Sequence, residues 1–325
     1  MVAGYWDIHE YKFVVRIKVA KYLYFLADIK GKMNYDSIFS IVDHENQHSN
    51  LQRPYILKYS KELNTAKKAA AEASAIIREY ASDESFSIEL KGKNDLVTDA
   101  DISAENKIIE ILNEAFPEDL ILAEESQARK ILPEGRVWII DPIDGTTNFA
   151  HQFPRYCVSI ALWDQKTPRV GLVLEVASQE LFTAVDGEGA WMNGKEIHVS
   201  QNTDPSSSLI GTGFPYNNLE LVDNYLVLFK RMMEKTHGVR RPGTAAWDLC
   251  NVACGRFEGF YEYGLSPWDV AAGALIIQEA GGVICDWEGE DDWLFGERII
   301  AGNKVIKDFL KDEIQACFQK VQLKK

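Results

Sequence analysis

Residues 138–149 read WIIDPIDGTTNF. The apolar start of this stretch predicts a buried strand that delivers Asp141 at its carboxyl end. Asp144 follows three residues later, so both carboxylates can converge on one cation, with the Ile143 carbonyl as a further oxygen ligand. Gly145 allows close approach of the backbone to a ligand, and the residues after it are predicted to open a short helix whose free N–H groups suit phosphate. An ordinary Asp-Gly turn is the alternative interpretation, whereas the spacing of an EF-hand calcium loop is absent.

Three further blocks carry acidic residues next to predicted strand or helix ends. They read NDLVTDAD at 94–101, AEES at 123–126 and GLSPWDVAAG at 264–273. Each block alone has a plainer interpretation, since adjacent glutamates are usually solvated and both Asp101 and Asp269 could simply be helix N-caps. Clustered carboxylates repel each other and cost stability unless a cation compensates them. Together, the blocks therefore favour a metal site.

The overall charge limits the classes of partner. The chain has 325 residues and a formal net charge of −14, with 49 acidic against 35 basic side chains. This balance argues against direct binding to nucleic acid or to an anionic membrane. The five cysteines are an odd number without a CxxC pair, which predicts reduced thiols and a cytoplasmic protein. No stretch reaches the roughly 18 continuous apolar residues of a membrane span.

The chain divides into an accessory segment, a folded region and a short tail. We expect residues 1–57 to be an accessory segment, an interfacial or partner-binding helix, or a region upstream of a misassigned start. The folded region is predicted to begin at residue 58, with halves at about 58–203 and 204–317, and the tail is 318–325. Helical spacing predicts a helix over 61–81 and a second helix from about 102 to 115, with Asp101 as a candidate N-cap. Another helix is predicted at about 244–254. Further helices and strands alternate downstream, which predicts mixed α and β layers.

These blocks and their order resemble the inositol monophosphatase family. DPIDGTTNF resembles the central metal-binding motif of that family almost letter for letter, and WDVAAGALIIQEAGG resembles its C-terminal signature. NDLVTDAD and AEES match two weaker upstream blocks. The similarity spans roughly residues 58–317 and implies an α+β fold, a layered αβαβα sandwich of two α+β halves. It also implies a magnesium-dependent phosphatase that forms a homodimer.

The resemblance assigns roles to individual residues. The implied metal ligands are Glu124, Asp141, the Ile143 carbonyl, Asp144 and Asp269, with Asp101 near an additional metal. The implied catalytic residues are Glu124, Thr146 and Asp101, of which Glu124 and Thr146 match the pair that positions and activates the attacking water. The implied substrate contacts are Ile143, Asp144, Gly145, Thr146, Gly243, Thr244, Ala245, Glu262 and Asp269.

The predicted reaction is hydrolysis of a small phosphate monoester by metal-activated water. All implied ligands are oxygen donors, which favours two or three Mg²⁺ ions over zinc. Thr147 and Asn148 favour the inositol monophosphatase branch, and Glu262 could accept hydrogen bonds from the hydroxyls of a polyol. Inositol monophosphate is the first prediction. The alternatives are fructose 1,6-bisphosphate, histidinol phosphate, another sugar or polyol phosphate, a nucleotide 3′-phosphate, or a non-catalytic binding role in transcription complexes.

Overall fold

The computed structural model describes residues 58–82, 88–92, 95–126, 131–216 and 218–318. The side chains of residues 88–97 are not described. The accessory segment 1–57 lies outside the described residues, as does the tail beyond Phe318. The predictions for those two segments therefore stay predictions.

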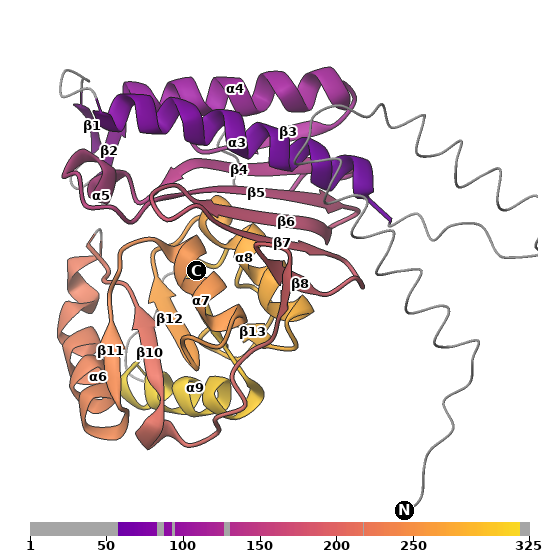
Figure 1. Ribbon diagram of the computed structural model, residues 1–325. Coiled ribbons are helices and arrows are strands. Elements are labelled where there is room, and N and C mark those ends of the chain that lie inside the picture. The colour runs from indigo at the N-terminus through magenta and orange to yellow at the C-terminus, as the bar shows by residue number, and fades with distance from the viewer. Residues whose placement is uncertain (1–57, 83–87, 93–94, 127–130, 217, 319–325) are drawn as a thin grey trace, which may run out of the picture. The chain divides into compact units, whose positions relative to one another are not determined.

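The described chain contains both helices and strands (Figure 1). The α-helices are α3 (Ser60–Ser82), α4 (Asp99–Ala115), α5 (Thr146–Ala150), α6 (Val222–Lys235), α7 (Ala245–Ala253), α8 (Pro267–Glu279) and α9 (Lys304–Phe318). A seven-stranded sheet has the order β3 (Leu120–Ala123), β4 (Arg136–Asp144), β5 (Cys157–Asp164), β6 (Thr167–Glu175), β7 (Glu180–Val185), β8 (Ala190–Met192) and β9 (Lys195–Ile197). A five-stranded sheet has the order β11 (Gly238–Arg240), β10 (Leu209–Thr212), β12 (Gly259–Tyr263), β14 (Arg298–Gly302) and β13 (Val283–Cys285). A small hairpin pairs β1 (Ile88–Gly92) with β2 (Asp95–Thr98).

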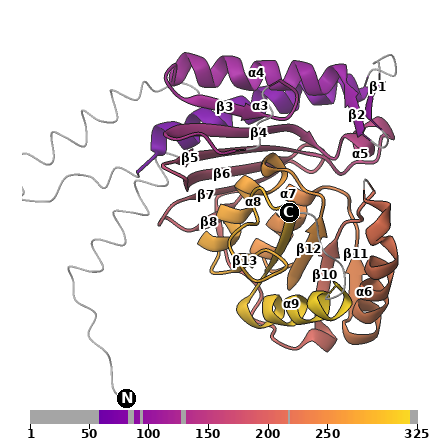
Figure 2. The same cartoon turned by 180° about the vertical axis from the view of Figure 1, so that it is seen from behind.

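The elements stack in five layers. Helices α3 and α4 cover one face of the seven-stranded sheet, α7 and α8 lie between the two sheets, and α6 and α9 cover the far face of the five-stranded sheet (Figures 1 and 2). Three buried apolar clusters match the three helical layers. The prediction of a layered αβαβα sandwich is therefore confirmed.

Strand β4 shows how the seven-stranded sheet is covered on both faces. Its side chains alternate between two cores: Trp138 and Ile140 pack under α3 and α4, whereas Val137 and Ile139 pack against α7 and α8. Successive side chains of a strand point to opposite faces, so a strand covered on both faces is apolar throughout. The run of apolar residues before Asp141 is the sequence signature of this double burial.

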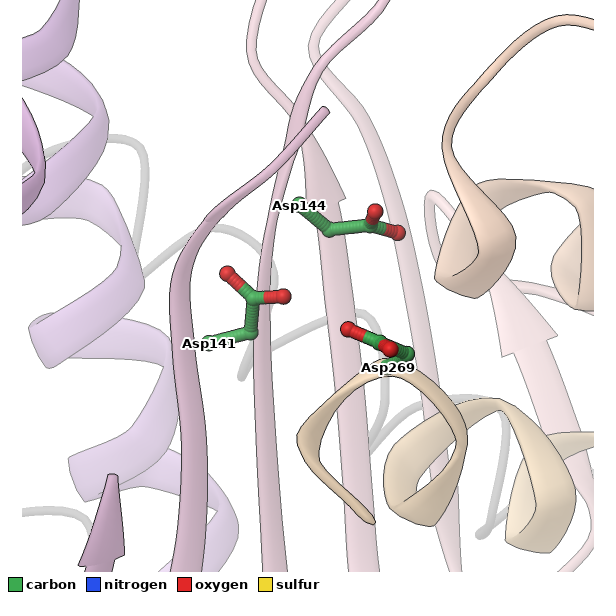
Figure 3. Close-up of side chains that lie close together, drawn as sticks. All are labelled: Asp141, Asp144 and Asp269. Carbon is green, nitrogen blue, oxygen red and sulfur yellow. The ribbon is translucent and has the colours of Figure 1, made fainter. Parts of the chain in front are cut away.

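The end of β4 differs from the prediction. The strand does not stop at Asp141 but continues to Asp144, with an irregular register against β5 between these two residues. Pro142 has no N–H to donate to the ladder, which favours such an irregularity. In a regular strand, side chains three residues apart point to opposite faces. The irregularity re-aims them, and both aspartates point toward the same space (Figure 3).

The described helices and the cysteines agree with the composition. No described helix combines the length and the apolar character needed to cross a membrane. All five cysteines are unpaired thiols.

Candidate active site

Three aspartates from two elements converge at the end of β4. Asp141 and Asp144 come from the strand, and Asp269 comes from the first turn of α8 (Figure 3). Each offers a carboxylate oxygen that lies within 4.8 Å of those offered by the other two. Asp141 is only 1% exposed, and Asp144 is buried as well. The structure therefore brings together three of the predicted ligands from positions up to 128 residues apart.

Burial and mutual repulsion raise the pKa of each of these carboxyls. Burial is the main cause for Asp141, and the charges of Glu124, Asp144 and Asp269 add to it. Burial, together with the charge of Asp269, raises the pKa of Asp144 to about 8, although backbone N–H groups of α7 oppose the rise. Burial raises the pKa of Asp269 to about 6, against the hydrogen bond from the Ser266 amide. In the absence of a cation, the ionised forms are costly here.

The chemistry of the donors fits a hard divalent cation. Among the described residues, no Lys, Arg or His side chain makes an ion pair with any of the three aspartates. Clustered acids without a counter-charge are compensated when they coordinate a metal. Carboxylate oxygens are the preferred ligands of Mg²⁺ and Ca²⁺.

Two of the predicted site acids lie in helix capping boxes, which corrects the interpretation of them as N-caps. Helix α4 begins at Asp99 with Thr98 as its N-cap, and Asp101 is the third helical residue, whose carboxylate accepts from the Thr98 amide at 2.8 Å. Helix α8 is capped by Ser266, and Asp269 accepts from the Ser266 amide at 2.7 Å. A capping box satisfies orphan N–H groups and locks the acid in one orientation. The sequence pattern did not reveal the capping box of α4, because it predicted the helix to begin at about residue 102 instead of Asp99.

Asp101 is joined to Thr146 at the start of α5. The Thr146 hydroxyl lies 3.1 Å from Asp101 Oδ1 and 3.0 Å from the Ile143 carbonyl oxygen. Asp101 is completely buried. The predicted catalytic threonine is therefore linked to the predicted acid at position 101.

Glu124 lies near this group but outside the cluster of three. It follows β3, its amide donates to the Ile140 carbonyl at 3.3 Å, and its charge raises the pKa of Asp141. It is half-buried. The parallel pairing of β3 with β4 explains this position, because the carboxyl ends of parallel neighbours meet at one edge.

Gly145 forms the tight turn between β4 and α5. Its φ of 97° is in the left-handed region. A Cβ at this position would lie 2.8 Å from the Thr244 hydroxyl oxygen and 3.0 Å from the Arg155 carbonyl oxygen. Glycine is therefore required both by the backbone conformation and by the close approach of the second half of the chain.

Residues 243–245, which are predicted to contact the alcohol portion of the substrate, lie beside the aspartates at the end of β4. Thr244 is buried and precedes α7, which begins at Ala245. The amide of Ala246 donates to Asp144 Oδ2 at 2.7 Å. Gly243 also has a left-handed φ of 91°. This segment therefore contacts a predicted metal ligand directly.

Glu262 is the predicted polyol-binding residue on β12. Burial raises its pKa to about 8; the positive charge of Arg241 opposes this rise, and the charges of Asp144 and Asp269 reinforce it. A Cβ at Gly213 would come within 1.7 Å of Glu262 Oε1, so the carboxyl rests directly on the Gly213 backbone. The structure therefore places Glu262 within the electrostatic reach of the cluster, outside the three converging carboxylates.

Sequence reasoning missed one residue near this end of the site, Asp248. Asp248 in α7 is 1% exposed, and its Oδ1 has no hydrogen-bond partner among the described residues. Burial and the charges of Glu262 and Asp144 raise its pKa well above the usual value, whereas Arg241 lowers it. The signal was available in part, because Asp248 follows GTAAW on a predicted helix, but helical position alone does not identify its surroundings.

The chain is similar in sequence to known proteins. A model of the inositol monophosphatase family matches residues 58–321. A protein named putative Nus factor SuhB, from Neisseria meningitidis, is 44% identical over 251 residues, which cover 77% of this chain and 96% of that protein. Nus factor SuhB from Escherichia coli is 36% identical over 263 residues, covering 79% and 98%.

Two solved structures have a similar fold. The extragenic suppressor protein suhB from Bartonella henselae has a TM-score of 0.75 at 38% identity, covering 81% of this chain and 100% of that one. An inositol monophosphatase from Anabaena has a TM-score of 0.71 at 38% identity, covering 79% and 96%.

Proposed function

The chain belongs to the inositol monophosphatase family, and from that premise we propose that it hydrolyses small phosphate monoesters, with inositol monophosphate as the preferred substrate. Phosphatase activity is supported at the level of the family. The observation that carries the proposal is the convergence of Asp141, Asp144 and Asp269 beside the hydrogen-bonded pair of Asp101 and Thr146.

The carboxylates would hold the metal. We assign Asp141, Asp144 and Asp269 as ligands of Mg²⁺, together with Glu124 and the Ile143 carbonyl. Asp101 would lie near an additional ion. When bound, Mg²⁺ neutralises phosphate charge and makes water a stronger nucleophile near neutral pH.

Thr146 and Asp101 would orient the water that attacks phosphorus. A threonine hydroxyl has a single hydrogen and two lone pairs. When Thr146 donates that hydrogen to Asp101 or to the Ile143 carbonyl, its oxygen keeps a lone pair that can accept from a water molecule. Asp101 also accepts from the Thr98 amide, which holds its carboxylate in place. Glu124 would activate the same water together with Thr146.

The substrate would lie across both halves of the chain. Residues 143–146 would contact the phosphate, and Gly243, Thr244, Ala245 and Glu262 would contact the alcohol portion. The short hydrogen bond from Ala246 to Asp144 supports this assignment, because it places the start of α7 beside the metal ligands. A carboxylate such as Glu262 accepts hydrogen bonds from hydroxyls, which favours a polyol over an aryl leaving group.

A substrate panel tests the proposal. Phosphate release would be measured with and without Mg²⁺ on inositol 1-phosphate, fructose 1,6-bisphosphate, histidinol phosphate, adenosine 3′,5′-bisphosphate and p-nitrophenyl phosphate. We expect Mg²⁺-dependent turnover with the highest kcat/KM on inositol 1-phosphate. A higher kcat/KM on another member of the panel would replace the substrate, and no turnover of any member would overturn the phosphatase assignment.

The names of the curated relatives favour a second candidate function. Several are called Nus factor SuhB, and we propose a role in transcription complexes as that second function. The net charge of −14 favours protein contacts over direct RNA contacts. An Asp141→Asn variant would separate the two functions, since binding to purified RNA polymerase complexes should persist when turnover is lost. Absence of binding by the unaltered protein would exclude the second candidate.

A further inference from the structure

The side-chain amide of Asn148 joins two segments that are almost 100 residues apart. Its Nδ2 lies 2.8 Å from the Arg155 carbonyl oxygen and 3.0 Å from the Pro242 carbonyl oxygen. The Gly243 carbonyl at 3.3 Å and the Thr244 hydroxyl at 3.4 Å lie slightly farther away. A carboxamide has two hydrogens, so the two shorter contacts are the main bonds and the other two acceptors share them.

The surroundings of Asn148 leave little room for movement. The Thr244 hydroxyl donates to the same Arg155 carbonyl at 2.9 Å. A Cβ at Gly243 would meet the Asn148 amide nitrogen at 3.1 Å, and a Cβ at Gly145 would meet the Thr244 hydroxyl oxygen at 2.8 Å. Residues 145–148 and 242–244 therefore form a tight seam, in which glycines allow backbone contact and Asn148 supplies the donors.

This seam connects the two ends of the proposed substrate site. Residues 143–146 lie on one side of it and are proposed to contact the phosphate. Residues 243–245 lie on the other side and are proposed to contact the alcohol portion. Any shift of the second segment would change the distance between phosphate and alcohol contacts without altering β4, which carries Asp141 and Asp144.

We propose that Asn148 is a positioning residue that selects compact polyol phosphates, because it holds residues 242–244 against α5. The proposal rests on the proposed phosphatase function. The position of Asn148 in the DGTTN motif does not by itself define this role. The selected substrates are monoesters in which hydroxyl groups lie close to the phosphate, as on a small ring. An aryl phosphate, which has no such hydroxyls, depends on the phosphate end alone.

Asparagine is the residue that this seam requires. Its surroundings offer acceptors, three of them backbone carbonyls, so the side chain must donate. An apolar replacement removes the side-chain donor from these part-buried carbonyls, and among the described residues only the Arg155 carbonyl keeps another donor, the Thr244 hydroxyl. Each lost bond weakens the seam. An aspartate of the same shape would present oxygen to oxygen and push the segments apart.

Asn148→Ala tests the proposal, with Asn303→Ala as a matched control. Asn303 also ties distant backbone together, since its Nδ2 donates to the Ser200 and Asn202 carbonyls at 3.1 and 2.7 Å, but these bonds join α9 to the 200–202 loop. The values of kcat and KM would be measured on inositol 1-phosphate and p-nitrophenyl phosphate at saturating Mg²⁺. For Asn148→Ala we expect KM for inositol 1-phosphate to rise on the order of 10-fold, with less than about a 3-fold change for the aryl phosphate. For Asn303→Ala, any change should be equal for both substrates.

Amide hydrogen exchange provides a readout that does not need activity. Loss of the seam should speed exchange of the amides of residues 243–246 by about 10-fold or more in Asn148→Ala and leave them unchanged in Asn303→Ala. Unchanged protection, or equal effects on both substrates, would overturn the proposal. If Asn148→Ala does not fold, Asn148→Ser, which keeps one donor, is measured with the same criteria. A wild-type protein that hydrolyses neither substrate would refute the proposed function, and the exchange data would still decide the positioning role.

Discussion

The two ends of strand β4 treat buried acids in opposite ways. At its first residue, Arg136 donates from Nε to Asp119 Oδ1 at 2.8 Å and from Nη2 to Glu62 at 3.1 Å. The Trp138 indole donates to the other oxygen of Asp119 at 2.9 Å. Each acid at this end therefore has a charged or polar donor, and the hydrogen bond that Arg136 donates to Asp119 raises the pKa of Arg136.

At the other end of the same strand, the acids face one another. Asp141 and Asp144 point toward Asp269, and within the described residues no basic side chain makes an ion pair with them. The first end contributes to stability. The second end lowers the stability of the metal-free protein and provides a site for a cation. Strained or repelling groups of this kind concentrate at functional sites.

The largest predicted effect is on turnover at the acidic end. Asp141→Asn should lower kcat/KM by about 10³-fold or more, because it removes a proposed ligand while preserving size and shape. Without Mg²⁺ the same change should raise the stability by about 1 kcal/mol or more, since it removes a repelling buried charge. Phosphate release, Mg²⁺ binding and thermal unfolding would be measured on one preparation.

Asp286→Asn is the matched control for that substitution. Asp286 is a buried aspartate, 3% exposed, whose Oδ1 accepts from the amides of Glu288 and Glu290 in its own loop. We expect a loss of stability and normal turnover per folded molecule. Normal turnover and unchanged Mg²⁺ affinity in Asp141→Asn would contradict the site described above.

At the paired end, Arg136→Met should affect stability instead of turnover. The substitution leaves Asp119, whose side chain is only 7% exposed, without its cation. Because Arg136 is partly exposed, we expect a loss of about 2–3 kcal/mol, less than for a fully buried pair. For a domain of this size, that corresponds to roughly 4–12 °C in Tm. If kcat/KM falls when it is measured at a temperature well below Tm, and stability is unchanged, then the two ends of β4 do not differ in function as described.

A substitution of Glu262 tests whether every acidic residue near the three aspartates contributes to metal binding. Glu262→Gln should raise KM for inositol 1-phosphate by about 10-fold, because the amide is a weaker acceptor than a carboxylate for substrate hydroxyls. Turnover of p-nitrophenyl phosphate and the affinity for Mg²⁺ should change little. Equal losses on both substrates would place Glu262 in the metal-binding machinery.

The stability of the metal-free protein should depend on pH. The pKa of Asp144 is raised to about 8 in the folded state, against about 3.9 in an unfolded chain. As pH rises from about 4 toward 8, the unfolded chain ionises first, so this group contributes less and less to stability. Tm should therefore fall over this range without Mg²⁺.

Saturating Mg²⁺ should reverse that trend. Proton release accompanies metal binding to carboxylates, so the stabilisation by Mg²⁺ should grow as pH rises toward 8. Differential scanning calorimetry at several pH values, with Mg²⁺ and with a chelator, would measure both curves. If the two curves run parallel, the acidic cluster is not the origin of the metal-linked stability.

The start of helix α4 shows what local sequence patterns cannot predict. Helix α4 was expected from about residue 102 with Asp101 as its N-cap, whereas it begins at Asp99 and is capped by Thr98. Both Thr and Asp favour helix N-termini, and they are close together in this stretch. The buried hydrogen bond from Thr146 to Asp101 comes from 45 residues away, so propensity could not distinguish the two positions.

By itself, the sequence predicted mixed α and β layers and the acidic character of the site, because apolar periodicity and short-range spacing are local properties. The apolar run before Asp141 predicted a buried strand, and two aspartates three residues apart predicted a shared cation, whereas the order of the layers came from the family resemblance. Only the tertiary structure decided that an irregular register at Pro142 turns both aspartates to one side, and that Asp269 meets them. It also decided that Asn148 holds residues 242–244. Contacts across about 100 residues depend on how layers pack, and a linear pattern does not encode packing distances.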